Sequence, residues 1–183
     1  LYMATRATLL HASMAGAILA LAAVFAVTAT VMTGSALVRA ILFPVGFCML
    51  YLLGFDLLTG VFVLTPRAWL DRRPGVTVQG ILRNWGLVFL GNFLGALTVA
   101  FMMAFIFTYG FSVPPNEIGQ KIGHIGEART LGYAQYGLMG WLTIFIRGML
   151  CNWMVSTGVV GAMISTTVSG KVIAMWMPIM LFF

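Results

Sequence analysis

Asp56 is the residue of this chain whose surroundings most need a chemical explanation. It is one of four acids among 183 residues, and it interrupts an apolar run between Gly54 and Gly60. A carboxylate among apolar residues needs either an ionic partner, for which Arg147 in a later apolar run is a candidate, or a polar cavity with a ligand. Glycine on both sides permits the backbone to leave a helix there. The segment therefore predicts a broken helix at a candidate site.

The other reactive side chains are dispersed. His11 precedes the first apolar run and His124 lies in a polar segment, so we expect both to be solvated or capping residues. Cys48 and Cys151 lie within apolar runs and are expected to pack as thiols. No catalytic triad, phosphate-binding loop or metal-ligand spacing is visible, so we expect no enzyme activity, no cofactor and no metal.

The composition is that of a membrane protein. Hydrophobic residues make up 61% of the chain, charged residues 8%, and the mean hydropathy is +1.03. Soluble domains carry roughly 25% charged residues. The net charge of +6 would favour a nucleic-acid partner in a soluble protein, but here the basic residues are scattered or lie at the ends of apolar runs, where they set topology and meet anionic lipid. We therefore expect a lipid bilayer and no nucleic acid as partner.

Apolar runs long enough to cross about 30 Å of hydrocarbon predict several helical spans. The first is densest at residues 14–32, and the second is interrupted, with parts at 40–55 and 57–64. The third covers 84–109 and the fourth 137–166, with Arg147 inside it. A fifth begins at Lys171 and is cut short at Phe183. We predict an all-α polytopic protein in which residues 1–183 are one incomplete transmembrane domain of about four and a half spans.

Charge in the connections predicts the orientation. The segment 65–83 holds Arg67, Arg72, Arg73 and Arg83 against Asp71 alone, and short cytoplasmic segments collect such positive charge. Alternation then places the N-terminus in the cytoplasm and the long loop 110–136 outside. The third span also carries Gly91 and Gly95, a small-residue face that is typical of close helix contact in a bundle or an oligomer.

Five motifs, in their order and spacing, resemble the formate/nitrite transporter family over residues 36–183. They are Leu42-Phe43-Pro44-Val45-Gly46-Phe47, the segment 54–60, Asn84-Trp85 through Gly91-Asn92-Phe93-Leu94-Gly95, the segment 147–155 and the segment 170–178. The resemblance implies an aquaporin-like protomer of six helices, the second and fifth broken, in a homopentamer with one pore per protomer. It also implies a multi-pass protein of a bacterial inner or plasma membrane and a channel for small monovalent anions, formate or nitrite, with or without a proton.

The same resemblance assigns site residues. It implies that the loop breaking the second helix covers residues 56–60, beginning at Asp56, and that Thr59 and Asn152 bond a central histidine. Side chains that would narrow the pore are Phe43, Phe47, Leu57 and Leu58 on the cytoplasmic side and Phe182 on the outer side.

Two departures accompany the resemblance. The family's histidine falls a few residues beyond the position of Phe182, where this chain stops at Phe183. Tyr136 occupies the position of an outer lysine that attracts the anion, so Lys121 or Arg129 would have to serve instead, beside Glu117 and Glu127.

Two other functions remain open at this point. One is a channel for hydrosulfide or another weak acid, which the same apolar slit would pass. The other is a membrane anchor subunit of a redox enzyme, which would need His or Met ligands at facing depths. The 13 methionines are more simply explained as flexible apolar packing.

Overall fold

Long apolar helices dominate the structure, a computed structural model that describes residues 4–182, with Phe182 described in its backbone only. Three helices are long and apolar enough to cross a bilayer: α1 (Thr5–Thr33), α5 (Val78–Phe107) and α8 (Gly137–Ile164). Shorter apolar helices are α2 (Ala36–Leu42), α3 (Pro44–Leu52), α4 (Leu58–Leu70) and α9 (Val168–Phe182). The described residues contain no strand. The prediction of an all-α polytopic membrane protein is confirmed.

Local side chains define where the helices end. α1 stops at Gly34, whose φ of 68° is left-handed and whose N–H donates to the carbonyl of Thr30 at 2.8 Å. The hydroxyl of Thr77 accepts from the N–H of Gly80 at 3.1 Å and so caps the start of α5. Pro44 is the first residue of α3, where a missing N–H costs no helical hydrogen bond. The three long helices begin up to nine residues before the predicted apolar runs and end within two residues of them.

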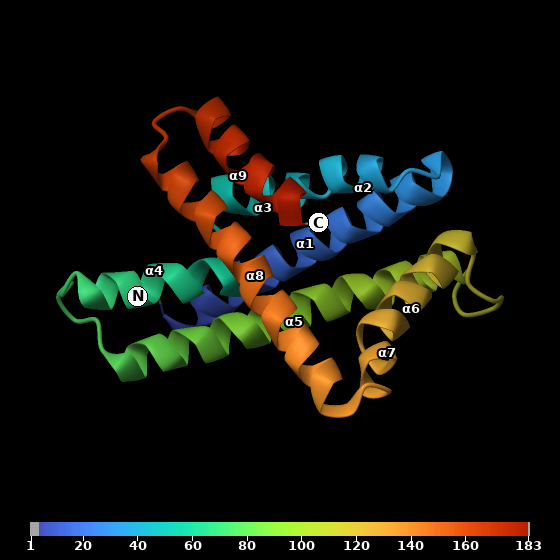
Figure 1. The fold of residues 1–183 in the computed structure, drawn as a ribbon, viewed down its shortest axis with the longest axis horizontal. Helices are drawn as coiled ribbons and strands as arrows, with labels where there is room; N and C mark the ends of the chain where they lie inside the picture. The colour runs from blue at the N-terminus through green and yellow to red at the C-terminus, as the bar shows by residue number, and fades with distance from the viewer. Residues whose placement is uncertain (1–3, 183) are drawn as a thin grey trace.

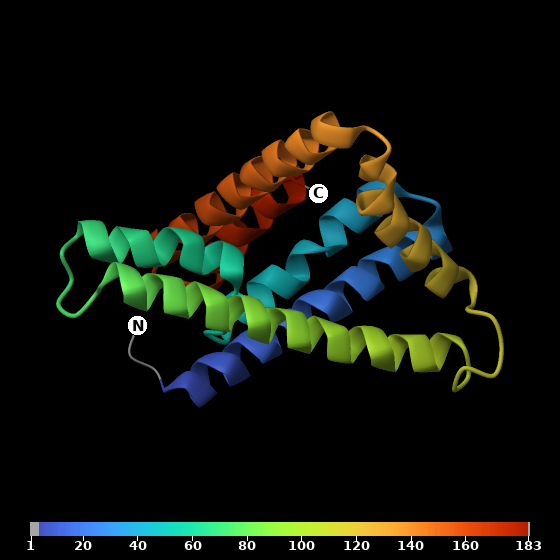
Figure 2. The ribbon, with the colours of Figure 1, turned by 90° about the horizontal axis from the view of Figure 1, so that it is seen from below.

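The helices form two groups that meet at the second span. α1 and α5 pack side by side, with α4 beside α5 (Figures 1 and 2). The indole N–H of Trp85 ties α5 to α4 by donating to the hydroxyl of Thr65 at 2.9 Å. α8 and α9 form a helical hairpin, of which α9 packs on α3 and α8 on α4. α3 and α4 thus lie between the two groups.

The segment expected to be a long outer loop is partly helical. Residues 110–136 contain α6 (Glu117–Arg129) and the single turn α7 (Leu131–Ala134). The side chain of Asn116 caps α6 by accepting from the N–H of Gly119 at 2.9 Å. α6 turns back against α1 and α5 (Figure 2), so the segment covers part of the bundle.

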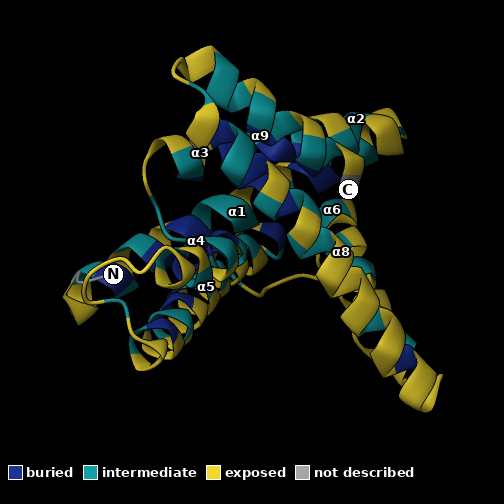
Figure 3. Cartoon of the chain, turned by 60° about the vertical axis from the view of Figure 1, so that its left-hand side comes forward, coloured by how far each residue is buried: buried dark blue, intermediate teal, exposed yellow. Residues whose placement is uncertain are grey.

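Burial is uneven between the groups. The main core joins α1, α3, α8 and α9 around fully or nearly fully buried Ala15, Val155, Met175 and Ile179. By contrast, the half of α8 nearest α7 is largely exposed (Figure 3). An apolar face of this length is unfavourable in water. In a membrane it is covered by lipid or by neighbouring helices.

Candidate functional site

The second span is interrupted where its sequence carries glycine and aspartate. α3 ends at Leu52, α4 begins at Leu58, and residues 53–57 are not helical. Gly54 has φ 72°, its N–H donates to Tyr51 at 3.1 Å, and the N–H of Phe55 donates back to Leu50 at 2.9 Å. This pair of bonds around a left-handed glycine is the Schellman ending of a helix.

The non-helical stretch differs from the predicted loop 56–60 by about three residues. Thr59 and Gly60 belong to the first turn of α4, and Gly60 is absent from the positive-φ residues. Of the two flanking glycines, only Gly54 adopts a left-handed φ, which requires the conformational freedom of glycine. That α3 and α4 act as the halves of one broken transmembrane helix stays a prediction.

Asn92 of α5 holds this stretch in place. Its Oδ1 accepts from the N–H of Leu58 at 2.9 Å, and its Nδ2 donates to the carbonyls of Asp56 at 2.9 Å and Ala12 at 2.8 Å. The first N–H of α4 and a carbonyl of the break are therefore satisfied by a side chain, as non-helical backbone at membrane depth requires. Sequence reasoning placed Asn92 in a motif but gave it no role. An amide eight residues inside an apolar span was the available signal.

Glycines let Asn92 approach. A Cβ on Gly95 would overlap the backbone carbonyl of Ser13, and one on Gly16 would overlap that of Asn92 itself. A Cβ on Gly91 would lie 2.5 Å from that of Ala12. Gly91 and Gly95, the small-residue face of the third span, thus pack against α1 of the same chain.

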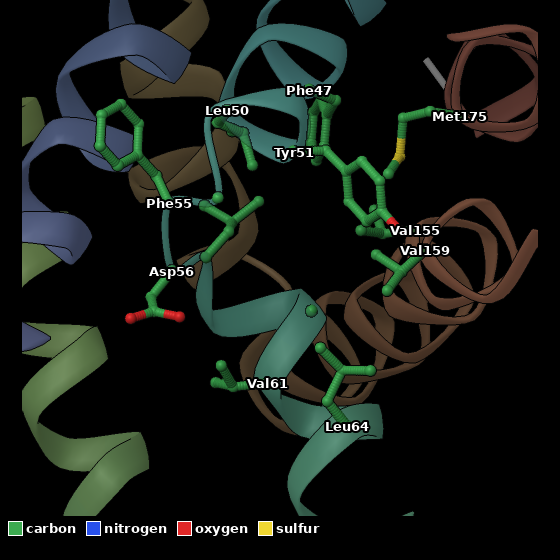
Figure 4. Close-up of a pocket in the computed structure, with 13 residues that line it drawn as sticks. Phe47, Leu50, Tyr51, Phe55, Asp56, Val61, Leu64, Val155, Val159 and Met175 are labelled. Carbon is green, nitrogen blue, oxygen red and sulfur yellow. The ribbon is translucent and has the colours of Figure 1, made fainter. Parts of the chain in front are cut away.

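A cavity of about 190 Å³ lies beside the break and is lined by residues of α3, α4, α8 and α9 (Figure 4). Its lining is almost wholly apolar. The side chains and glycines around it are Phe47, Leu50, Tyr51, Gly54, Phe55, Asp56, Leu57, Gly60, Val61, Leu64, Val155, Val159 and Met175. The ring of Tyr51 lies between Phe47 and Val155 (Figure 4), and sequence reasoning did not single it out.

The predicted constriction residues separate into two groups. Phe47 and Leu57 line this cavity, and Phe43 packs edge-on against Phe47 with ring centroids 5.6 Å apart. Leu58 is not part of the cavity lining and packs instead in a second cluster with Ala12, Val61 and Val88, of which Val61 also lines the cavity. The side chain of Phe182 lies outside the described residues.

The predicted polar residues lie near the cavity, and two of them have a buried oxygen without a hydrogen bond. Thr59 Oγ1 and Asn152 Oδ1 are buried and accept no hydrogen bond within the described part of the chain. Asn152 shares a helix face with Val155 and Val159, three and seven residues on, which line the cavity. The carboxylate of Asp56 turns away from those valines toward α1 and α5 (Figure 4).

The alternative of an Asp56–Arg147 pair is wrong. Arg147 donates instead to the hydroxyl of Tyr133 and lies 5.9 Å from the centre of its ring. His11 also lies elsewhere than expected: it is inside α1, half-buried, with its ring edge-on to Phe55 at 5.7 Å. It was expected to be solvated because the apolar run begins after it, whereas α1 begins at Thr5.

The remaining candidates are exposed. His124 lies on α6 and Lys121 one turn before it. Tyr136, at the position of the family's outer lysine, is 63% exposed and directly precedes α8. No group of three His, Cys, Asp or Glu residues capable of holding a metal ion occurs within residues 4–182.

The family model for formate/nitrite transporters matches residues 1–183. The chain is 35% identical to the formate channel FocA of Haemophilus influenzae over 177 residues, covering 92% of this chain and 57% of that protein. It is 31% identical to the "Probable formate transporter" of Methanothermobacter thermautotrophicus, covering 80% and 54%.

A solved structure agrees in fold. A pentameric formate channel with formate bound superimposes with a TM-score of 0.71 at 24% identity, covering 97% of this chain and 68% of that one. The chain spans a little over half the length of the two relatives. With its whole length matched by the family model, this multi-pass membrane protein belongs to the formate/nitrite transporter family.

Proposed function

We propose that this chain forms part of a channel that passes a small monovalent anion, formate or nitrite, alone or with a proton. The observation that carries the proposal is the apolar cavity where the second span is interrupted. Transport proteins use breaks of this kind to build substrate sites at membrane depth. The formate channels and transporters among the relatives give the substrate class.

Electrostatics explains why such a cavity would favour a weak acid. A bare anion loses its hydration in an apolar passage and gains little in return. The protonated, neutral acid loses far less. We propose that the buried acceptors of Thr59 and Asn152 face the transported species or a central histidine, because buried polar atoms ordinarily have a partner.

The narrow part of the pore is assigned to Phe43, Phe47 and Leu57, with Phe182 on the outer side. The contact between the two phenylalanine rings and the place of Leu57 beside the cavity support this assignment. The packing of Leu58 against Val88 favours a supporting role for Leu58 at the start of α4.

We further propose a homopentamer with one pore per protomer, in a bacterial inner membrane, with a cytoplasmic N-terminus. The pentameric neighbour supports the assembly. The arginines of residues 65–83 support the orientation. Native mass spectrometry in several mild detergents tests the assembly, and a monomer throughout would contradict it.

Other functions have less support. A hydrosulfide channel would use the same slit, and direct competition with formate would reveal it. A redox anchor subunit is not favoured, because the chain belongs to a family of transporters. We likewise propose that the protein has no catalytic activity.

The function is tested with the full-length protein in liposomes. Formate or nitrite uptake should rise as the external pH falls toward the acid's own pKa, because the neutral fraction grows, while chloride uptake stays low. Phe47→Ala should widen the passage and relax selectivity. Phe101→Ala, at an exposed phenylalanine of α5 that does not line the cavity, is the matched control. Unchanged rate and selectivity in correctly inserted Phe47→Ala would contradict the pore assignment.

A further inference from the structure

The carboxylate of Asp56 is not explained by the proposed pore. It turns away from the valines of α8 toward α1 and α5 (Figure 4), and Arg147 is bonded to Tyr133 instead. An ionised carboxylate at membrane depth is costly unless a charge or several hydrogen-bond donors lie beside it. A group on α1 or α5 must therefore interact with this carboxylate.

His11 of α1 faces this part of the break. Its ring packs edge-on against Phe55, with ring centroids 5.7 Å apart and ring planes at 77°, and Phe55 turns toward α1 (Figure 4). The backbones are close as well, because the Nδ2 of Asn92 donates to the carbonyls of both Ala12, at 2.8 Å, and Asp56, at 2.9 Å. Residues 11–12 and 55–56 are therefore neighbours in space.

His11 and Asp56 are close enough for their charges to interact. The other titratable or charged side chains on the helices packed around Asp56, within residues 4–182, are placed differently. They are Arg6 of α1, which is exposed, Cys48 of α3, which donates to the carbonyl of Val172, Tyr51 of α3, which lines the cavity, Arg67 of α4, which pairs with Asp71, and Arg83 of α5, which donates to Thr5. His11 is therefore the candidate partner of Asp56.

The two ends of the break are held by different residues. Asn92 bonds the carbonyl of Asp56 and the N–H of Leu58, so it holds the end that leads into α4. At the other end the side chains of Phe55 and Asp56 face α1 and its histidine. Phe55 also lines the cavity. The position of its ring therefore decides part of the cavity wall.

We propose that His11 is a positioning residue for the α3 end of the break. Its protonated ring attracts the carboxylate of Asp56, and this attraction, with the ring contact, holds Phe55 in the wall of the cavity. The neutral ring keeps the contact with Phe55 and loses the attraction to Asp56. The consequence for transport rests on the proposed function, since a displaced Phe55 changes what passes only where the cavity belongs to a pore.

The attraction depends on pH in a defined direction. Histidine is the side chain that ordinarily changes charge between about pH 5 and pH 8. The charged pair is therefore present at the acid end of this range and is lost as the pH rises through it. A partly exposed charge pair changes an equilibrium constant by about two- to fivefold, and we expect effects of that size.

Amide exchange of the full-length protein, resolved to single residues, tests the positioning without any transport. In wild type, exchange of Gly54 and Phe55, whose N–H groups close the end of α3, should be about two- to fivefold faster relative to unfolded chain at about pH 8 than at about pH 5. Leu58, at the other end, should not change. His11→Phe keeps a ring without a charge and should remove this pH dependence, whereas His124→Gln, on the exposed face of α6, is the matched control and should retain it.

A double-mutant cycle tests whether His11 acts through Asp56. At about pH 5, Asp56→Asn should raise the exchange of Gly54 and Phe55 as His11→Phe does. The double variant should be no worse than either single variant, because both changes remove the same interaction. A merely structural role for the two side chains would give additive losses instead.

Chloride leak into liposomes measures the consequence for the pore. Chloride does not take up a proton in this pH range, so the pH dependence of its leak reports on the protein and not on the neutral fraction of a weak acid. Wild-type leak should rise about two- to fivefold from about pH 5 to about pH 8, because a less firmly held Phe55 widens an apolar passage that excludes hydrated ions. His11→Lys, which stays charged, should leak at the acid level at both pH values.

Several results would overturn the proposal. Exchange at Gly54 and Phe55 that does not depend on pH in wild type, or that keeps its pH dependence in His11→Phe, would remove the role of His11. Additive losses in the double variant would separate it from Asp56. If His11→Phe fails to fold, wild type and Asp56→Asn still decide. If wild type takes up neither formate nor nitrite but shows the expected exchange, the proposed function fails and the positioning role stands.

Discussion

Asn92 and Asn152 are the same residue type in two long apolar helices, yet they are bonded in opposite ways. Both are half-buried. The amide of Asn92 makes three hydrogen bonds to backbone at 2.8 to 2.9 Å, while the Oδ1 of Asn152 is buried and accepts none within residues 4–182. The hydrogen bonds of the Asn92 amide hold the break in place. The Oδ1 of Asn152 remains available to accept a hydrogen bond from a transported species.

Burial alone would therefore assign the two residues the same role. The bonding distinguishes them, because a buried polar group without a partner indicates a ligand, a water or a group outside the described residues. The comparison predicts that substitutions at Asn92 act on stability and substitutions at Asn152 act on transport. The same substitution at both positions tests this difference.

The largest effect is expected from Asn92→Leu. The variant loses three hydrogen bonds and leaves the N–H of Leu58 and the carbonyl of Asp56 unsatisfied at membrane depth. At ~1 kcal/mol for each bond, the loss in unfolding free energy is about 3 kcal/mol or more. Denaturation in detergent measures it, and amide exchange should rise first in residues 53–60. If Asn92→Leu is as stable as wild type and amide exchange in residues 53–60 is unchanged, Asn92 does not hold the break in place.

This role could not be derived from the sequence, although the break itself could. Gly54, Asp56 and Gly60 predict an interruption by their types alone. Which glycine takes the left-handed conformation depends on hydrogen bonds to Leu50 and Tyr51. The partner of the break, Asn92, is 36 residues away in sequence, and local patterns carry no information about contacts over that distance.

α6 was missed for a different reason. Gly119, Gly123 and Gly126 lower the helix propensity of this segment, and its polarity suggests a loop. The signal that it does form a helix was the spacing of Ile118, Ile122 and Ile125, which recur at helical intervals. All three are half-buried, in a helix that packs on α1 and α5. Tertiary packing there overrides intrinsic preference.

The second-largest effect, on the free energy of unfolding, is expected from alanine substitutions at glycines near the two asparagines. Gly95→Ala places a methyl group against the backbone of Ser13, where no flexible side chain can yield. We expect a loss of about 1–3 kcal/mol in unfolding free energy. Gly148→Ala, four residues before Asn152, meets nothing within 4 Å and should stabilise α8 slightly, because alanine is the better helix former. Equal losses at both glycines in thermal denaturation would show that α8 is packed as tightly as α5.

Asn152→Leu should have a smaller effect on free energy but a visible effect on function. The change removes an unpaired buried acceptor, so stability should stay within about 1 kcal/mol of wild type or rise. Uptake of formate or nitrite into liposomes should fall roughly tenfold, equivalent to ~1.4 kcal/mol in the barrier. If Asn152→Leu instead unfolded the protein as Asn92→Leu is expected to, the contrast between the two asparagines would be false.

Thr59→Val should have the smallest effect. Valine keeps the shape of threonine and removes only a hydroxyl, whose Oγ1 is buried and bonded to no described residue. Stability should be unchanged or rise by up to about 1 kcal/mol, because an unsatisfied polar atom is replaced by a methyl group. Thr65→Val, six residues further along α4, is the matched control. Its hydroxyl donates to Val61 at 2.7 Å and accepts from Trp85 at 2.9 Å, so its loss should destabilise the protein without a specific change in transport. If Thr59→Val lowers uptake by a few-fold while Thr65→Val lowers only the melting temperature, the unpaired hydroxyl serves the transported anion. If Thr59→Val transports as wild type does, the hydroxyl contacts only packed side chains. Asn152 is then the residue that supplies the polar group in the pore.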